Sequence, residues 1–260
     1  MTVRQGFTVE HGADPSESFA FAAERGFDYL ELNMDWTFER SRVDVDAVCD
    51  LADRYGLDLC VHLPYRLDVA SPLEHVREGS CRELEASIET AAEMGAERGV
   101  FHAGTFATEE KWGREVLREC LYESVERVVE YARDRGFEAV VENLKSPFFT
   151  AADFPALFDR TGATACLDTG HAHATGVSMA EQADLLREHG DRISHVHLND
   201  TRMDGDDEHL PVGVGKLDFA ELAGAMVETG WSGTCTHEVF TFDDEPRAFG
   251  KRRFDQLLDD

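Results

Sequence analysis

Residues 165–176 read ACLDTGHAHATG, residues 194–200 read SHVHLND and residues 206–219 read DDEHLPVGVGKLDF. The first two segments contain short apolar runs, which are typical of strands buried in a parallel sheet. Among the acidic and histidine side chains of these segments, the candidate ligands are Asp168, His171, His197, Asp200, Asp207 and His209. Carboxylates and imidazoles are ligands of divalent cations. The spacing therefore predicts one metal site, or several, at the ends of successive strands.

Strand-like and helix-like segments alternate along the chain. The strand-like segments are residues 3–9, 27–33, 57–64, 98–104, 137–143, 163–168, 192–199 and 232–240. The helix-like segments are residues 15–26, 44–56, 73–95, 111–136, 151–160, 179–189, 217–229 and 246–258. Eight such units in 260 residues predict an α/β protein with a single (β/α)8 TIM-barrel domain over residues 1–260. A doubly wound sheet is the alternative, but it usually offers a glycine-rich phosphate-binding turn, which this sequence lacks.

Polar residues stand at the carboxyl ends of the predicted strands, where barrel enzymes place their active sites. They are Asn33, His62, His102, Glu142, Asp168, His197 and Glu238. Side chains alternate between the barrel interior and the helix layer. The apolar Val141 suits the helix layer, so Glu142 is expected to point inward. By the same argument His195 and His197 point inward, and the deeper His195 is expected to be a core residue or to support the site.

The composition limits the classes of function. Basic residues number 25 and acidic residues 53, which gives a net charge of −28 at pH 7. Because a sequence-independent grip on phosphates comes chiefly from Lys and Arg, this balance disfavours nucleic acid as a partner. The acidic, lysine-poor composition also resembles that of proteins from halophilic organisms, in which salt screens the self-repulsion. In that case the charge reflects habitat more than partner.

The sequence also indicates a compartment. Its six cysteines form no CxxC pair, as expected for reduced thiols. No amino-terminal segment has the pattern of a signal peptide, and no apolar run reaches the roughly 18 residues that a bilayer span requires. We therefore expect a cytoplasmic protein without a membrane partner.

Four of the strand-end residues belong to the last four strands, which are neighbours in a barrel. They are Glu142, Asp168, His197 and Glu238. Three carboxylates and one imidazole make an oxygen-rich site suited to Mn²⁺, Mg²⁺ or Co²⁺, and Zn²⁺ is a further candidate. The side chains that extend this site are His62, His102, His171, Asp207 and His209. The sequence thus offers ligands for one to three metals.

The chain resembles the xylose isomerase-like TIM barrels, a superfamily that includes sugar isomerases, ketose 3-epimerases and the endonuclease IV family. The segments that carry the resemblance are VHLPY (61–65), FHAG (101–104), CLDTGHAHATG (166–176), HVHLND (195–200) and DEHLPVGVGKLDF (207–219). The resemblance implies counterparts for all nine ligands of the three-metal centre of endonuclease IV. It equally implies the single-metal site of the ketose epimerases at Glu142, Asp168, His197 and Glu238. The chain is shorter than typical endonucleases of that family.

We favour a metal-dependent isomerase or epimerase of a sugar or sugar phosphate, with proton transfer through an enediolate. Glu142 and Glu238 are the expected base and acid. The expected substrate-binding residues are Arg202, Asn33 and His62. The alternative is an endonuclease IV-like apurinic/apyrimidinic phosphodiesterase with a multi-metal centre. A barrel that binds metal without catalysis, and assembly as a homo-oligomer, are left open.

Overall fold

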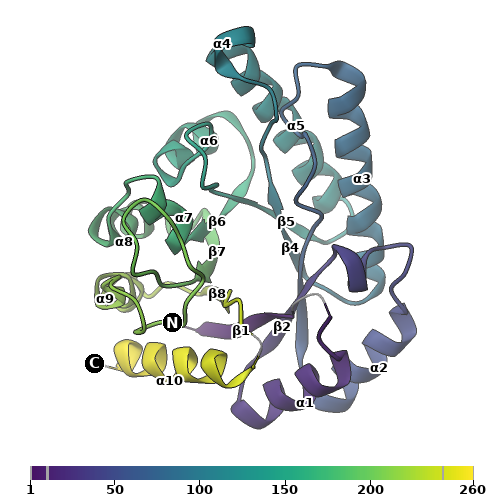
Figure 1. The fold of residues 1–260 in the computed structure, drawn as a ribbon. Coiled ribbons are helices and arrows are strands. Elements are labelled where there is room, and N and C mark those ends of the chain that lie inside the picture. Colours follow the sequence, from purple (N-terminus) through teal and green to yellow (C-terminus); the bar gives the residue numbers. More distant parts are fainter. Residues whose placement is uncertain (1, 10–11, 242, 260) are drawn as a thin grey trace.

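The computed structural model describes residues 2–9, 12–241 and 243–259 and contains a closed barrel of eight parallel strands (Figure 1). The strands are β1 (Val3–Val9), β2 (Tyr29–Asn33), β3 (Asp58–His62), β4 (Arg98–His102), β5 (Glu138–Glu142), β6 (Thr164–Asp168), β7 (Ile193–Leu198) and β8 (Gly233–His237). Each strand pairs with the next in sequence, and β8 pairs with β1. The predicted (β/α)8 TIM barrel is confirmed.

Helices surround the strands on the outside of the barrel (Figure 1). They are α1 (Pro15–Arg25), α2 (Val45–Tyr55), α3 (Glu74–Glu93), α4 (Glu109–Trp112), α5 (Arg114–Arg133), α6 (Phe154–Arg160), α7 (Thr169–Ala174), α8 (Met179–His189), α9 (Phe219–Thr229) and α10 (Glu245–Asp259). Two 3₁₀ turns, η1 (Trp36–Phe38) and η2 (Ala151–Asp153), complete the described elements. No helix in the described ranges is both long and apolar enough to cross a membrane.

Local sequence signals fix the ends of several helices. At the start of α2, the Asp44 side chain accepts a hydrogen bond from the Ala47 amide at 3.1 Å, which satisfies an amide that has no partner within the helix. At its end Gly56 has φ 64° and its amide donates to the Ala52 carbonyl. Glycine adopts this left-handed conformation without the steric cost of a Cβ atom. The chain can therefore turn at once into β3.

Alternation along the strands sorts side chains into two layers. Val141, Val196 and Leu198 are fully buried in the large core cluster outside the strands. Glu142 and His197 point to the opposite side, into the barrel, where their side chains meet. The inward orientation expected for both residues is confirmed, and it follows from the two-residue period of a strand.

Two helices differ from the sequence prediction. The six-residue helix α7 was not predicted; it begins directly after Asp168, whose side chain accepts a hydrogen bond from the His171 amide at 2.6 Å. The helix predicted over residues 111–136 is divided into α4 and α5 at Gly113, where φ is 81°. The break is local because this positive φ is incompatible with a continuous right-handed helix.

The two ends of the described chain meet. Helix α10 lies beside β1 (Figure 1), and Gln5 Nε2 donates a hydrogen bond to Asp255 Oδ1 at 2.6 Å. The contact joins residues 250 positions apart and holds the last helix against the first strand. Closure of the barrel brings the ends of β8 and β1 to the same mouth as the ends of β5, β6 and β7.

Candidate metal centre

The first group of candidate ligands lies at the ends of the last four strands. Its members are Glu142, Asp168, His197 and Glu238, all buried, with one ligand atom of each within 4.8 Å of the others. His197 Nδ1 is 3.2 Å from Glu142 Oε1, 3.4 Å from Glu238 Oε2 and 3.8 Å from Asp168 Oδ2. The structure thus brings together the four residues that the sequence placed on consecutive strand ends.

A second group shares Glu142 with the first. His62 Nε2 lies 3.4 Å from Glu142 Oε2, and His102 Nε2 lies 2.8 Å from the same oxygen. The other carboxylate oxygen of Glu142 faces the first group. Glu142 therefore stands between two groups of ligands and presents a different oxygen to each.

The third group comes from α7 and from the loop between β7 and α9. It contains His171, Asp207 and His209. Asp207 Oδ2 is 3.4 Å from His171 Nε2 and 3.0 Å from His209 Nε2. His209 Nδ1 also lies 3.5 Å from Glu238 Oε2, which connects this group to the first. All nine predicted ligands therefore gather in three adjoining groups; that they bind metal stays a prediction.

Backbone carbonyls orient three of the imidazoles. His62 Nδ1 donates to the Leu63 carbonyl at 2.9 Å, and His171 Nδ1 donates to the Asn143 carbonyl at 3.1 Å. His209 Nδ1 donates to the Glu238 carbonyl at 3.3 Å. Because the proton then lies on Nδ1, the Nε2 atom that faces the neighbouring carboxylate is the one able to bind a cation.

Two buried amides hold Asp168 in place. Asn143 accepts a hydrogen bond from the Asp168 amide at 2.8 Å and donates one to the Asp168 carbonyl at 3.0 Å. Asn199 Nδ2 donates to Asp168 Oδ2 at 2.8 Å. A Cβ atom at Gly170 would lie 1.8 Å from Asn199 Oδ1, so glycine is needed where α7 passes this amide. Neither contact with Asp168 could be predicted from the sequence pattern.

The loop that carries Asp207 and His209 is organised by Asp200. Its buried carboxylate accepts hydrogen bonds from the backbone amides of Thr201, Gly213, Gly215 and Leu217, at 2.7 to 3.0 Å. Asp200 was first singled out as a group that a cation would favour, but its two oxygens are occupied by these amides. His209 has φ 49°, a conformation that is costly for a residue with a side chain and recurs at functional sites.

The acidic and imidazole groups alter one another's protonation. Burial lowers the pKa of His62, but the neighbouring Glu142 carboxylate outweighs it and raises the pKa to about 9. Burial likewise opposes the charges of Asp168 and Glu142 at His171, whose pKa rises to about 10. Burial, together with the Glu238 and Glu142 charges, raises the pKa of Asp168 to about 7 against the opposing effect of His171. Without a cation, protons on the imidazoles offset the negative charge.

The donor set fits divalent cations. Glu142 Oε2 and Glu238 Oε2 are buried in the described structure without a hydrogen bond of normal geometry. Burying a carboxylate oxygen without such a partner costs free energy unless a nearby positive charge, such as a bound cation, compensates it. A mixture of carboxylate oxygens and imidazole nitrogens suits Zn²⁺, Mn²⁺ or Co²⁺. The residues present are therefore suited to hold such ions.

A cavity of about 350 Å³ opens above the three groups. The residues that line it are Asn33, His62, Tyr65, His102, His171, His209, Glu238 and Phe240. The Phe240 ring stacks on His209, with 3.9 Å between ring centroids. Asn33 and His62, two of the residues predicted to bind substrate, therefore face the cavity. Arg202, the third, is not among its lining residues and forms an ion pair with Glu208 at the rim.

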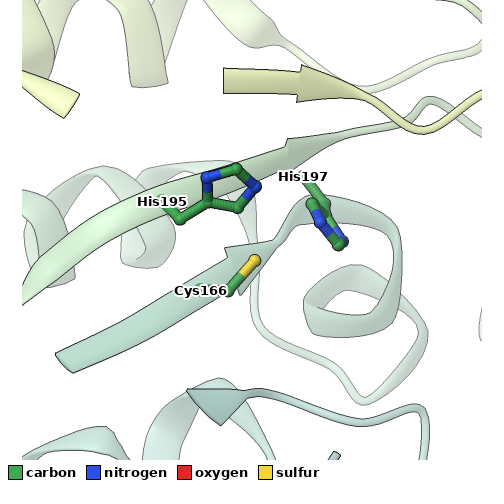
Figure 2. Close-up of side chains that lie close together, drawn as sticks. All are labelled: Cys166, His195 and His197. Carbon is green, nitrogen blue, oxygen red and sulfur yellow. The ribbon is translucent and has the colours of Figure 1, made fainter. Parts of the chain in front are cut away.

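Beneath His197 lies a layer of buried polar side chains. Cys166, on β6, approaches His195 and His197, which project from β7 (Figure 2), with ligand atoms within 4.8 Å of one another. Both nitrogens of His195 already have partners, Thr234 Oγ1 at 2.5 Å and Glu31 Oε2 at 3.0 Å. Burial raises the pKa of the Cys166 thiol well above its ordinary value, so it stays protonated. These contacts give His195 the supporting position that alternation predicted.

Glu31 was missed by the sequence analysis. It is completely buried in β2 and contacts both His195 and His197. The available signal was a charged residue in the apolar strand YLELN, on the same side as Asn33 two residues later. That pattern identifies an inward-facing carboxylate but does not reveal its partners on β7.

The fold and the clustered ligands at the barrel mouth define a TIM barrel with a candidate metal centre. Residues 19–253 match the family model of the xylose isomerase-like TIM barrels. The chain therefore belongs to this family, as its motifs predicted.

Among the similar proteins described below, one is named as an endonuclease and one as a 3-epimerase-like protein. An uncharacterized protein of Methanocaldococcus jannaschii is 30% identical over 228 residues, which cover 83% of this chain and 76% of the relative. A probable endonuclease 4 of Mycobacterium leprae is 29% identical over 226 residues, 83% of this chain and 86% of the relative. A D-tagatose 3-epimerase-like protein has a similar crystal structure, with a TM-score of 0.82, 26% identity and 98% of each chain covered. The TTHB071 protein of Thermus thermophilus, soaked with ZnCl₂, has a TM-score of 0.72, 27% identity and 97% coverage of each.

Proposed function

We propose that this protein is a metal-dependent phosphoesterase whose nine ligands hold up to three divalent cations. The observation that supports it best is the position of Glu142, which presents Oε1 to the group around His197 and Oε2 to His62 and His102. A carboxylate placed in this way would offer one oxygen to each of the two ligand groups if both held cations. The third group, at His171, Asp207 and His209, adjoins Glu238. A site for one cation does not require this arrangement.

The protein side chains have separable roles in this proposal. Divalent cations at the three positions would supply Lewis-acid stabilisation of phosphoryl charge and activation of water. Glu142 has both oxygens directed at ligand groups and is poorly placed to accept a proton from substrate. Glu238 lines the cavity with its carboxylate and is the better proton acceptor. Tyr65 and Phe240 form walls that limit the water around the bound ester.

The charged residues around the mouth of the cavity favour a small substrate over a long polyanion. Lys145 forms ion pairs with Asp206 and Asp207, and Arg202 with Glu208. These two basic groups are thus engaged by acidic neighbours and are not free to track a phosphate backbone. A cavity of about 350 Å³ suits a substrate the size of a sugar phosphate.

The test combines metal counting with a simple diester. We expect the chain reconstituted with Zn²⁺ or Mn²⁺ to hold more than one ion and to hydrolyse bis(p-nitrophenyl) phosphate, with activity lost on chelation. His209→Ala should bind one ion fewer and lose on the order of 10²-fold in activity. His75→Ala, which changes a histidine on α3 away from the centre, is the matched control. A fully active protein with a single ion would contradict the proposal.

Isomerisation or epimerisation of a ketose is the second candidate. It is favoured by the size of the cavity and by Glu238, which faces the place where a sugar would lie beside the first group. In this case Glu142 and Glu238 would act as base and acid on either side of the reacting carbon, with one cation stabilising the enediolate. Incorporation of solvent deuterium into a panel of ketoses tests it. Activity that persists in His209→Ala with one bound ion would favour this candidate over the phosphoesterase.

A further inference from the structure

The side chain of Glu31 is surrounded by hydrogen-bond donors beneath the metal centre. Its two oxygens face Thr8 Oγ1 at 3.4 Å, Thr236 Oγ1 at 2.8 Å, His195 Nε2 at 3.0 Å and His197 Nε2 at 3.2 Å. The carboxylate is completely buried. A buried carboxylate is tolerated when several donors satisfy it. Glu31 therefore marks a built polar site, although it lies too deep in the barrel to touch a substrate in the cavity.

His197 is oriented opposite to three other imidazoles of the centre. Those that direct Nδ1 to a backbone carbonyl are His62, His171 and His209. His197 instead directs Nε2 to Glu31 and Nδ1 to Glu142 and Glu238, at 3.2 and 3.4 Å. Its outer partner is thus a carboxylate rather than a neutral carbonyl. A carboxylate acceptor fixes the proton on Nε2 more firmly and makes the opposite nitrogen a stronger donor to a metal.

We propose that Glu31 is a positioning residue for the metal ligand His197. Its carboxylate accepts a hydrogen bond from the Nε2–H group, so that the unprotonated Nδ1 faces the group formed with Glu142, Asp168 and Glu238. This inference rests on the metal centre of the proposed function but not on the reaction catalysed. It makes cation binding at this one group depend on a residue from β2, which β1 and β8 separate from β7 in the barrel.

His195 completes the arrangement. It shares Glu31 with His197, and its Nδ1 is held by Thr234 Oγ1 at 2.5 Å. The rings of His195 and His197 lie nearly perpendicular, with centroids 5.1 Å apart (Figure 2). The contact with His195 Nε2 holds the Glu31 carboxylate, and the carboxylate in turn holds Nε2 of the His197 ring.

The experiment measures Zn²⁺ affinity of the intact chain by competition with a chromophoric chelator. We expect Glu31→Gln to weaken one binding position by about 10- to 100-fold and to leave the others within about twofold. Glu31→Asp, which keeps the carboxylate, should recover part of that loss. The matched control is Tyr29→Phe, which removes a 2.8 Å hydrogen bond to Thr236 in the same layer without touching His197. It should retain the affinity of every position.

A second measurement covers the case in which Glu31→Gln does not fold. Nitrogen-15 NMR of the histidine rings in the unsubstituted chain loaded with Zn²⁺ should show the fixed hydrogen of His197 on Nε2. A hydrogen on Nδ1 alone would overturn the inference, as would equal weakening at all positions or no weakening at any in Glu31→Gln. If the unsubstituted chain binds no Zn²⁺, the metal centre itself fails. That outcome is distinct from a chain that binds Zn²⁺ without help from Glu31.

Discussion

Glu238 combines two properties that separate it from the other carboxylates of the centre. It belongs to the first ligand group, and it lines the cavity where a substrate would bind. Its Oε2 atom lies 3.4 Å from His197 Nδ1 and 3.5 Å from His209 Nδ1. In the proposed function, this one residue would connect cation binding, proton transfer and the third ligand group.

We predict that Glu238→Gln keeps the fold and loses most of the turnover. Glutamine has the same size but neither the negative charge nor the proton-accepting oxygen, so kcat/KM should fall by about 10²- to 10⁴-fold. Circular dichroism and metal content would be measured beside activity. Glu208→Gln, at the rim of the same mouth, is the control and should be nearly fully active. Near-normal turnover in Glu238→Gln would show that Glu238 is neither ligand nor base.

The imidazoles also predict how cation binding depends on pH. Despite burial, neighbouring carboxylates raise the pKa of His62 and His209 to about 9 and that of His171 to about 10, from 6.5. Near pH 7 these rings are protonated in the cation-free chain and must release protons to bind an ion. We therefore expect affinity for Zn²⁺ to rise with pH until about pH 9–10. Calorimetric titration in buffers of different ionisation heat would count the released protons.

The cation-free chain should show the opposite trend in stability. The raised folded-state pKa values mean that the fold favours the protonated rings over the unfolded chain, in which the pKa is about 6.5. Their contribution is complete below pH 6.5 and is lost as the pH rises through about 9 to 10. The melting temperature should therefore fall over this interval without cations. Affinity and apo stability that are both independent of pH would contradict the assigned proton positions.

The positions of candidate ligands could be predicted from the sequence more readily than the residues that hold those ligands in place. The convergence of Glu142 and His197 could be predicted because they follow apolar runs and share an inward orientation. Glu31 could not, because its role depends on contacts with β7 across 164 and 166 residues of chain. Asn143 and Asn199 are the last residues of two predicted strands, and only the fold places their amides against Asp168.

At the scale of elements, the β7–α9 loop determines whether the third ligand group forms. Asp200 gathers the amides of Gly213, Gly215 and Leu217 around one carboxylate. A Cβ atom at Gly215 would lie 2.3 Å from Asp200 Oδ1 and 2.4 Å from the Thr201 carbonyl. The glycine is thus required by close approach, and the loop has little freedom to choose another path.

We predict that Asp200→Asn destabilises the protein by about 3 kcal/mol, because an amide nitrogen would face donors that now bind a charged oxygen. The third ligand group should be lost, while the groups that contain Glu142 remain. Chemical denaturation gives the first effect, and the number of bound Zn²⁺ ions gives the second. The control is Asp218→Asn at the start of α9, where asparagine caps a helix as well as aspartate does. Unchanged stability and metal content in Asp200→Asn would contradict this role.

The elements themselves were predictable to different degrees. The eight strands and the long helices follow from repeated apolar periodicity, which is a local property. Helix α7 escaped prediction because it is short and contains Gly170, and its start depends on the Asp168 side chain. The division at Gly113 depends on a single backbone angle, which periodicity does not report.

At the scale of the whole molecule, acidity and the metal centre make opposing demands. The chain carries 53 acidic and 25 basic residues. Cations at the mouth would offset part of the charge near the cavity, where Asp207 and Glu238 lie. They would not supply the extended row of positive groups that a nucleic-acid backbone requires. The charge distribution therefore disfavours nucleic acid as a substrate, whatever reaction the centre supports.

We predict that the protein incises abasic duplex DNA poorly, even under conditions in which it hydrolyses a small diester. Binding to duplex DNA depends on basic groups that neutralise successive phosphates. At this mouth Lys145 is held by Asp206 and Asp207, and Arg202 by Glu208. Arg66, beside the cavity, lies over the Tyr65 ring.

The test is an incision assay across a salt series with Zn²⁺ or Mn²⁺, run beside bis(p-nitrophenyl) phosphate in the same buffers. High salt screens repulsion between the acidic rim and DNA, but it also weakens contacts between basic groups and phosphates. Added salt should therefore not restore efficient incision, whereas hydrolysis of the small diester should change little. Efficient, cation-dependent incision that disappears in His209→Ala would show that the rim does bind DNA. The phosphoester chemistry would then stand, and the small-substrate assignment would give way to a nucleic acid.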